Sequence, residues 1–189
     1  MILETKQLKL IPLSYEQVEM FRHLNDELED SLGLPHSDRE IPEHFRGALL
    51  RYTLPWIKED PENYLFATVW VMIEAESNSI VGDIGFKRKA DPSGYVEIGY
   101  STQPRHRRKE FMTEAIGALT SWALTHDEVK AVIAETLEIN DASIKALRTN
   151  GFTEFHYVKP VTGENRIPEN PDVKMLWWKK TRESDETKL

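Results

Sequence analysis

The sequence has no cysteine among its 189 residues. This absence excludes disulfide bonds, thiolate zinc sites, iron–sulfur clusters and cysteine nucleophiles. Basic residues are the minority of the charged ones, with 24 Lys and Arg against 32 Asp and Glu, and the formal net charge is −8. Such an acidic chain lacks the electrostatic profile of a general nucleic-acid or anionic-membrane binder, so we expect neither partner.

Long apolar runs are also missing. No stretch approaches the ~18 consecutive apolar residues of a membrane span, and residues 1–6 lack a basic region followed by an apolar signal core. We therefore expect a cytoplasmic location. With 40% hydrophobic and 30% charged residues, the composition is that of a globular protein. Its length predicts one domain over residues 1–180, followed by a polar C-terminal tail over 181–189.

Hydrophobic patterning predicts an α/β fold built on a single sheet. We expect strands over residues 8–12, 64–74, 80–86, 95–100, 131–136, 153–158 and 173–180. We expect helices over residues 15–24, 109–125 and 141–149, with short broken helices between 25 and 60. Short turns make the strands between 64 and 100 antiparallel. The whole order predicts a mixed, mostly antiparallel sheet of about seven strands flanked by helices.

The most unusual local feature is the run Arg105-His106-Arg107-Arg108-Lys109 in an otherwise acidic chain. It lies between a predicted strand and the start of a predicted helix. A helix N-terminus carries free N–H groups and about half a positive charge, so it binds anions. Arginine and lysine beside it suit phosphate recognition. A solvated charge run in a surface loop is the alternative explanation.

A second feature is the segment from Asn140 to Phe152. Asn140 or Asp141 can cap the helix that follows, and Asn150-Gly151 is typical of a helix C-terminus. Taken alone, these are the capping residues found at the ends of many helices.

Together, four segments resemble the GNAT superfamily, and more narrowly its RimJ/RimL-like branch of ribosomal-protein N-terminal acetyltransferases. They are Gly82-Asp83-Ile84-Gly85-Phe86, Glu97-Ile98-Gly99-Tyr100, residues 104–115 and residues 140–152, in the order and spacing of that superfamily. The resemblance covers nearly the whole chain. It implies a GNAT-like fold in which the parallel strands 95–100 and 131–136 splay apart to admit acetyl-CoA, and it implies no metal.

The resemblance also implies which residues bind acetyl-CoA. Main-chain groups of Tyr100, Ser101, Thr102 and Gln103 would hold the acetyl and pantetheine portions. The pyrophosphate would lie on the backbone of Arg107, Arg108, Lys109, Glu110, Phe111, Met112 and Thr113. Asn140 and Ser143 would lie close to the pantetheine and the thioester.

The phosphate loop departs from the family pattern. Glu110 stands where the first glycine belongs, Met112 replaces the second small residue, and Arg108 replaces a further glycine. Glycine lets a phosphate approach the backbone closely, whereas Glu110 adds a side chain and a negative charge. An acidic residue in the first helical turn is also simply stabilising. We expect coenzyme binding with weakened or altered affinity.

Two residues are candidates for catalysis. Leu147 occupies the position of the tyrosine acid of many family members, so the resemblance assigns the acid role to Ser143, which could instead bond its own helix turn. Glu97, with Glu135 on the neighbouring strand, is the candidate base through a water-relayed path. An exposed strand carboxylate is the alternative for Glu97.

The function we expect is transfer of acetyl from acetyl-CoA to a primary amine by direct attack in a ternary complex. The acceptor could be a protein N-terminus or a small-molecule amine. The alternative is a degenerate member that binds acyl-CoA or another anion without efficient transfer. A nucleic-acid module using residues 105–109 is a third option, which the net charge disfavours. Trp177 and Trp178 could contribute to a homodimer contact, since adjacent strand residues face opposite sides.

Overall fold

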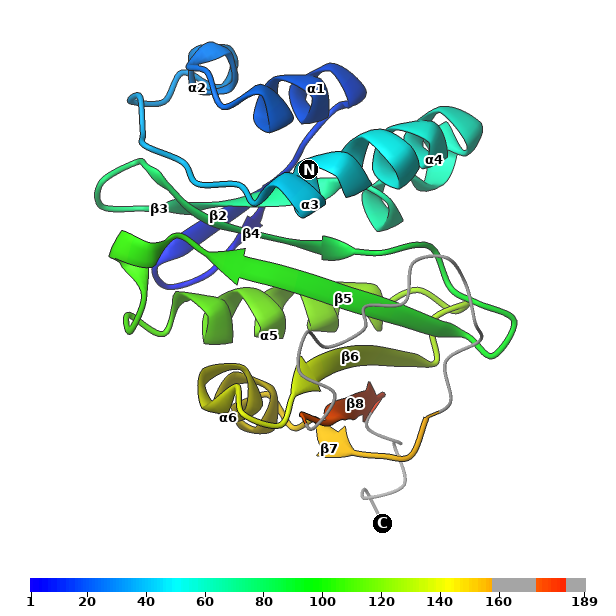
Figure 1. Ribbon diagram of the computed structural model, residues 1–189. Helices are drawn as coiled ribbons and strands as arrows, with labels where there is room; N and C mark the ends of the chain where they lie inside the picture. The colour runs from blue at the N-terminus through cyan, green and yellow to red at the C-terminus, as the bar shows by residue number, and fades with distance from the viewer. Residues whose placement is uncertain (158–172, 183–189) are drawn as a thin grey trace.

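The computed structural model describes residues 1–157 and 173–182. Its central feature is one sheet in the order β1-β2-β3-β4-β5-β6-β8-β7, shown in Figure 1. The strands are β1 Leu3–Glu4, β2 Leu8–Pro12, β3 Val69–Glu74, β4 Ile80–Phe86, β5 Tyr95–Thr102, β6 Ala131–Leu137, β7 Thr153–Glu154 and β8 Met175–Thr181. Only β5 and β6 pair in parallel among these strands, so the expected mixed, mostly antiparallel sheet is confirmed.

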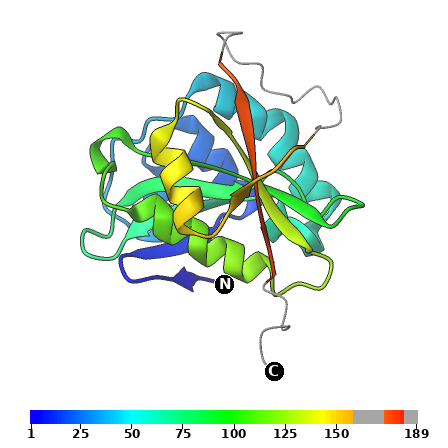
Figure 2. The same ribbon diagram turned by 90° about the horizontal axis from the view of Figure 1, so that it is seen from below.

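Helices cover both faces of the sheet. On one face lie α1 Tyr15–His23, α2 Glu27–Leu32, α3 Glu43–Ala48 and α4 Leu54–Glu59, with the π-helix η1 Leu49–Thr53 between the last two. On the other face lie α5 Phe111–Ala123 and α6 Asp141–Thr149, which are in front of the sheet in Figure 2. Two 3₁₀ helices, η2 Pro61–Phe66 and η3 Pro104–His106, precede β3 and α5.

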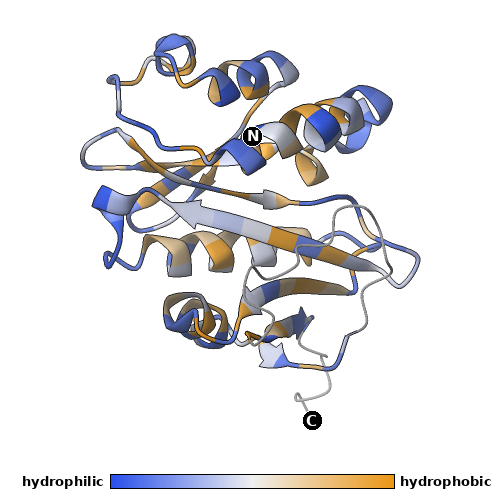
Figure 3. Ribbon diagram, viewed as in Figure 1, coloured by the Kyte–Doolittle hydropathy of each residue, from blue (hydrophilic) through white to orange (hydrophobic). Residues whose placement is uncertain are grey.

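Two hydrophobic cores form because strand side chains alternate between the faces. On β3, Trp70 and Met72 join the core under α5 and α6, whereas Val71 and Ile73 join the core under α1 to α4. Figure 3 shows the apolar stripes of the helices and strands that supply these cores. The same figure shows β5 becoming paler and more polar towards its C-terminal end, which is where the chain leaves the packed core.

The expected strand over 64–74 is wrong in its first part. Residues 64–66 belong to η2, and β3 begins only at Val69. The apolar run is used for packing rather than for strand pairing, since the Phe66 ring packs against Trp122 and the carbonyl of Leu65 accepts a hydrogen bond from the Trp70 indole. A short apolar run does not distinguish these cases by periodicity.

Several other element boundaries differ from expectation. The short β1 is an additional strand that the sequence did not predict. The strand expected over 153–158 is β7, which spans only Thr153–Glu154, and residue 158 lies outside the described part of the chain. The helix expected over 109–125 begins at Phe111 and ends at Ala123.

Trp178 is fully buried, so it cannot contribute to a dimer contact.

The C-terminal end of the described chain is anchored rather than free. Thr181 is the last residue of β8. The Arg182 guanidinium donates to the carbonyls of Leu124 and His126, both at 2.6 Å. Residues 183–189 of the expected tail lie outside the described residues.

Candidate active site

The parallel strands β5 and β6 separate partway along their length. They pair from Tyr95–Ala131 to Ile98–Ala134. Beyond this point β5 pairs only with β4, and β6 pairs only with β8. Residues 99–102 and 135–137 therefore have one strand edge each without a strand partner. Backbone N–H and C=O groups need partners, so this separation can receive a ligand that hydrogen-bonds like a strand.

Tyr100 connects the separated part of β5 to α6. Its hydroxyl lies 2.7 Å from the hydroxyl of Ser143, and either oxygen can donate the hydrogen bond. The backbone N–H of Ser143 donates to the Asn140 side chain at 3.2 Å, and Asn140 is the N-cap of α6. Burial raises the pKa of Tyr100, although the Ser143 hydrogen bond opposes this shift. The expected residues Tyr100, Asn140 and Ser143 thus lie together.

The loop before α5 adopts a glycine-like backbone without glycine. Arg108 and Glu110 have φ angles of 65° and 58°, in the left-handed region, and Glu110 is the N-cap residue of α5. The Glu110 carboxylate accepts a hydrogen bond from the Thr113 hydroxyl and pairs with Lys145 of α6, both at 3.1 Å. These two contacts lower the pKa of Glu110, the Lys145 contact most. The carboxylate therefore points across the start of α5 towards α6.

The other residues of the expected phosphate loop differ in exposure and contacts. Arg107 donates to the Thr102 carbonyl at 3.4 Å, and Lys109 pairs with Glu74 at 3.2 Å. Phe111 is buried in the core, and Met112 packs against the core from a half-buried position. These contacts leave the arginine and lysine side chains exposed beside the start of α5.

Gln103 has a structural use that the sequence did not reveal. Its side-chain amide accepts from the Glu40 backbone N–H at 2.8 Å and donates to the Glu40 carbonyl at 3.2 Å. The buried amide therefore ties the segment between α2 and α3 to the end of β5. Its side chain is committed to this contact, and its backbone N–H donates to Val81.

Glu97 lies on the opposite face of β5 from Tyr100, in the stretch still paired with β6. Lys87 contacts both Glu97 and Glu135, the latter at 2.8 Å. Burial alone would lower the pKa of Lys87, but the two carboxylates outweigh it and raise the pKa. The ammonium thus bridges the two strands at the point where they separate. Sequence reasoning placed Glu97 and Glu135 together but missed Lys87.

Asp83 is a second residue that sequence reasoning missed. It lies on β4 opposite Ser101, whose hydroxyl donates to its carboxylate at 2.6 Å. Asp83 is only 5% exposed, and burial raises its pKa to about 6 against the opposing Ser101 hydrogen bond. The sequence signal that could have revealed Asp83 is its charge within an otherwise apolar strand, Ile80-Val81-Gly82-Asp83-Ile84.

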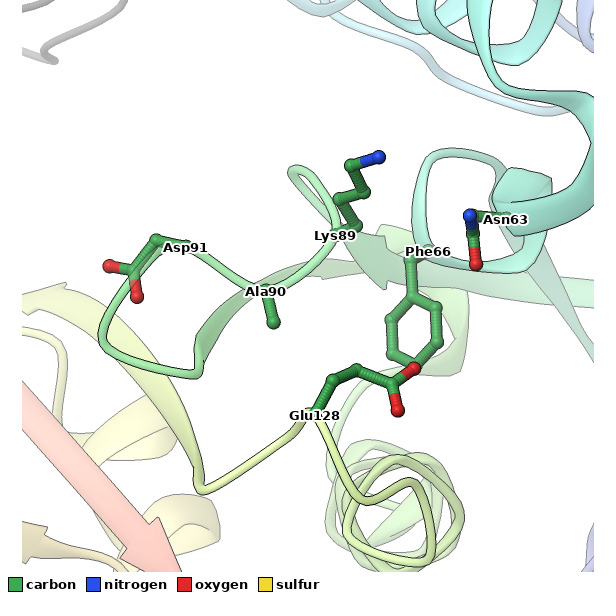
Figure 4. A pocket seen from close by; sticks show the side chains of 6 residues that line it. All are labelled: Asn63, Phe66, Lys89, Ala90, Asp91 and Glu128. Atoms are coloured by element: carbon green, nitrogen blue, oxygen red, sulfur yellow. The ribbon is translucent and has the colours of Figure 1, made fainter.

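A cavity of about 330 Å³ lies at the other end of β5. Its lining residues are Asn63, Phe66, Lys89, Ala90, Asp91 and Glu128. Figure 4 shows Phe66 and Glu128 side by side, with Lys89 and Asp91 pointing away from them. Lys89 is paired with Asp60 at 2.5 Å. Because Asp91 precedes the start of β5, the cavity is remote from the separated strand ends.

Within residues 1–157 and 173–182, no group of three His, Asp or Glu is arranged to hold a metal ion. None of the helices in this same part of the chain is long and apolar enough to cross a membrane.

Comparisons with known proteins agree with this architecture. Residues 7–153 match the family model described as an acetyltransferase (GNAT) domain. The uncharacterized N-acetyltransferase YjdG of Bacillus subtilis (strain 168) is 36% identical over 87 residues, which are 46% of this chain and 52% of that protein. This match therefore spans about half the length of that curated relative.

Two solved structures share the fold. A RimL ribosomal L7/L12 alpha-N-protein acetyltransferase in complex with coenzyme A aligns with a TM-score of 0.66 and 14% identity, covering 96% of this chain and 98% of that chain. The ribosomal-protein-S5-alanine acetyltransferase from Vibrio fischeri also gives 0.66, with 15% identity and 96% of each chain covered. The family model, which matches most of the sequence, and the separated parallel strands lead to one conclusion: the chain belongs to the GNAT acetyltransferase family.

Proposed function

We propose that the protein transfers an acetyl group from acetyl-CoA to a primary amine by direct attack in a ternary complex. The observation that carries this proposal is the separation of β5 and β6 after Ile98 and Ala134, with Tyr100 and Ser143 joined beside it. Membership of the GNAT family supports acetyl transfer in general. The coenzyme A held by the structurally similar RimL protein supports the choice of co-substrate.

The residues present suit acetyl-CoA. Residues 99–102 of β5 have backbone groups without a strand partner on the side of β6, and these can bond the acetyl and pantetheine portions. The N–H groups at the start of α5, together with Arg107, Arg108 and Lys109, can bind the pyrophosphate. Asn140 and Ser143, at the start of α6, would lie close to the pantetheine and the thioester. The acetyl-CoA thioester supplies the activated acyl group.

Ser143 is the proposed acid for the departing thiolate. Its hydroxyl bonds Tyr100 rather than its own helix turn, so a two-hydroxyl relay is available. Tyr100 has a raised pKa and remains protonated at neutral pH. A backbone N–H of β5 near Ser101 is the proposed donor to the thioester carbonyl.

Glu97 is the proposed base, acting through water. It lies on the face of β5 opposite Tyr100, so proton removal and proton donation would occur on opposite sides of the strand. The acceptor is a protein N-terminus or a small-molecule amine, and the first choice is supported by the alpha-N-protein activity of the RimL protein. The cytoplasmic location, the absence of nucleic-acid and membrane partners, and a homodimer stay predictions.

One observation favours a second candidate function. The Glu110 carboxylate lies at the start of α5, where the coenzyme pyrophosphate would bind. Like charges about 4 Å apart in water repel by about 1 kcal/mol. A family member with this residue could bind an acyl-CoA or another anion without efficient transfer.

Two measurements test the proposal. Acetyl-CoA at about 100 times its dissociation constant should stabilise the protein by roughly 2.7 kcal/mol, which thermal unfolding detects. Thiol release should then appear with at least one amine from a panel of N-terminal peptides, polyamines and amino acids. Binding without thiol release for any amine would favour the non-transferring alternative, and no binding would refute both.

The acid role has its own control. Replacing Ser143 by Ala should lower kcat more than it changes the KM for acetyl-CoA, because the hydroxyl acts in the transition state. Tyr100→Phe, which removes the neighbouring hydroxyl, is the matched variant. Unchanged turnover in Ser143→Ala would remove Ser143 from the acid role.

A further inference from the structure

We propose that Asp83 is a positioning residue for proton removal, acting through the hydroxyl of Ser101 on the acceptor amine. This inference rests on the proposed acetyl transfer and adds to it a second path for the amine proton, besides the water-relayed path through Glu97. Neither the sequence patterns nor the expected roles of Ser143 and Glu97 include Asp83.

The geometry places this pair at the reacting position. Ser101 belongs to residues 99–102 of β5, which have lost their pairing with β6. Its side chain bonds Asp83 at 2.6 Å and therefore lies on the face opposite Tyr100, since alternate residues of a strand face opposite sides. The backbone groups of Ser101 face Asp83 of β4, since Glu97 and Gln103 in the same alternation bond β4. The backbone groups of Tyr100 and Thr102, on either side of Ser101, face the gap left by β6. A thioester bonded there would lie next to the Ser101 hydroxyl, with the proposed acid Ser143 on the other face.

Asp83 has no evident structural reason to be a carboxylate. It is 5% exposed, and its partner on β3 is the apolar Val71. Burial raises the pKa of Asp83, and the Ser101 hydrogen bond opposes part of this shift. Buried charges are usually paired with an opposite charge. With the Ser101 hydroxyl as its partner, the buried Asp83 carboxylate can take up a proton near pH 6.

Other charged groups on this face of the sheet lie further along the strands. Lys87 follows Asp83 by four residues, and it contacts Glu97 of β5 and Glu135 of β6. Glu40, from the segment before α3, contacts Gln103 through its backbone. Four residues of a strand span about 13 Å. Glu97 therefore lies in the paired stretch, whereas Ser101 lies in the separated one.

The amine nitrogen bonds to the thioester carbonyl carbon, and the carbon–sulfur bond breaks. The nitrogen becomes acidic as the carbon–nitrogen bond forms, and its proton passes to the Ser101 oxygen while the Ser101 proton passes to Asp83. The departing thiolate takes a proton from Ser143, which recovers one from solvent through Tyr100. Asp83 then releases its proton to solvent.

The main test is the pH dependence of turnover in matched variants. In the wild type, kcat/KM for the amine should fall as the pH drops below about 6, where Asp83 becomes protonated. Asp83→Asn and Ser101→Ala should each lower kcat by roughly 100-fold or more. Both should abolish the fall in kcat/KM below pH 6, which is the acidic limb of the profile. The KM for acetyl-CoA should stay within about twofold of the wild-type value. The double variant should be no slower than either single variant, because the two substitutions block the same proton path.

Two further variants separate proton removal from structure. Glu97→Gln removes only the water-relayed path, so the rate should fall while the acidic limb set by Asp83 remains. Thr68→Val removes another buried hydroxyl bond, from Thr68 to the Leu13 carbonyl, and should lower stability without changing the pH profile. The inference is overturned if Asp83→Asn retains the acidic limb and the rate, or if Glu97→Gln alone abolishes the limb.

A stability measurement needs no activity. Because the pKa of Asp83 is raised on folding, the native state holds its proton more tightly, and stability falls as the pH rises from about 4 to about 6. Asp83→Asn should therefore raise the urea midpoint at pH 7.5 and have little effect at pH 4. A lower midpoint at pH 7.5 would show that the charged carboxylate stabilises the fold, which contradicts the inference.

The two proposals fail in different ways. If the wild type acetylates an amine and the Asp83 variant behaves like it, only this inference fails. If the wild type acetylates no amine in the panel, the proposed function fails and this inference fails with it.

Discussion

At the scale of single residues, the loop before α5 shows a conflict between side chain and backbone. Arg108 and Glu110 both adopt positive φ angles, which cost an L-residue other than glycine roughly 1–2 kcal/mol. Both occupy positions where the family pattern has glycine. The loop thus contains two left-handed residues, a conformation that glycine favours, although neither residue is glycine.

We predict that Glu110→Gly stabilises the protein by about 0.5–1 kcal/mol and tightens acetyl-CoA binding. It relieves the left-handed strain and removes a negative charge, while the lost pair with Lys145 is solvent-exposed and contributes little to stability. Urea unfolding and calorimetric titration measure the two effects. Glu110→Ala is the matched control, because it removes the charge and keeps the strain. Weaker binding by both variants would contradict the proposed repulsion.

At the scale of elements, a buried ion pair holds the segment between α2 and α3. The Arg39 guanidinium bonds both carboxylate oxygens of Glu29, at 2.7 and 3.0 Å, and also donates to the carbonyls of Phe21 and Asn25. The adjacent Glu40 backbone is the partner of Gln103. The pair therefore fixes the segment that contacts the end of β5, where the candidate site begins.

We predict that Arg39→Ala lowers the free energy of unfolding by about 3–5 kcal/mol, because it leaves the Glu29 carboxylate buried without its cation. Urea unfolding gives the loss, and amide exchange at residues 37–41 should rise with it. The double change Glu29→Leu with Arg39→Met should recover much of the stability. A loss under 1 kcal/mol for Arg39→Ala would show that the pair is not a main support.

At the scale of the whole molecule, one sheet joins two hydrophobic cores. Leu49 is fully buried in the core under α1 to α4, and Leu119 is fully buried in the core under α5 and α6. Both cores share the strands β3 and β4, which supply side chains to each face. This shared sheet should couple the two layers into one cooperative unit.

We predict that Leu49→Ala and Leu119→Ala each cost about 2–5 kcal/mol through the cavity left behind. Both variants should still unfold in one transition that coincides by tryptophan fluorescence and circular dichroism. Leu50→Ala, at an exposed site beside Leu49, is the control and should change little. Separate transitions for the two layers would refute the coupling.

Local sequence determined the elements and the order of the motifs. Ser14 caps the helix expected to begin at residue 15, with Gln17 completing a capping box. Gly151, of the Asn150-Gly151 pair typical of a helix C-terminus, is left-handed. The helix predicted over 141–149 is α6 without change. Caps and hydrophobic periodicity act within about one turn or a few residues, so such features can be read along the chain.

Only the tertiary structure decided which side chains meet at the candidate site. Ser101 and Asp83 are 18 residues apart in sequence, Tyr100 and Ser143 are 43 apart, and Lys87 and Glu135 are 48 apart. No local pattern specifies such pairs, because they depend on the register of β4 against β5 and on the point where β5 leaves β6. The raised pKa of Asp83 is likewise a result of burial, which a strand acquires only when the sheet is covered by helices.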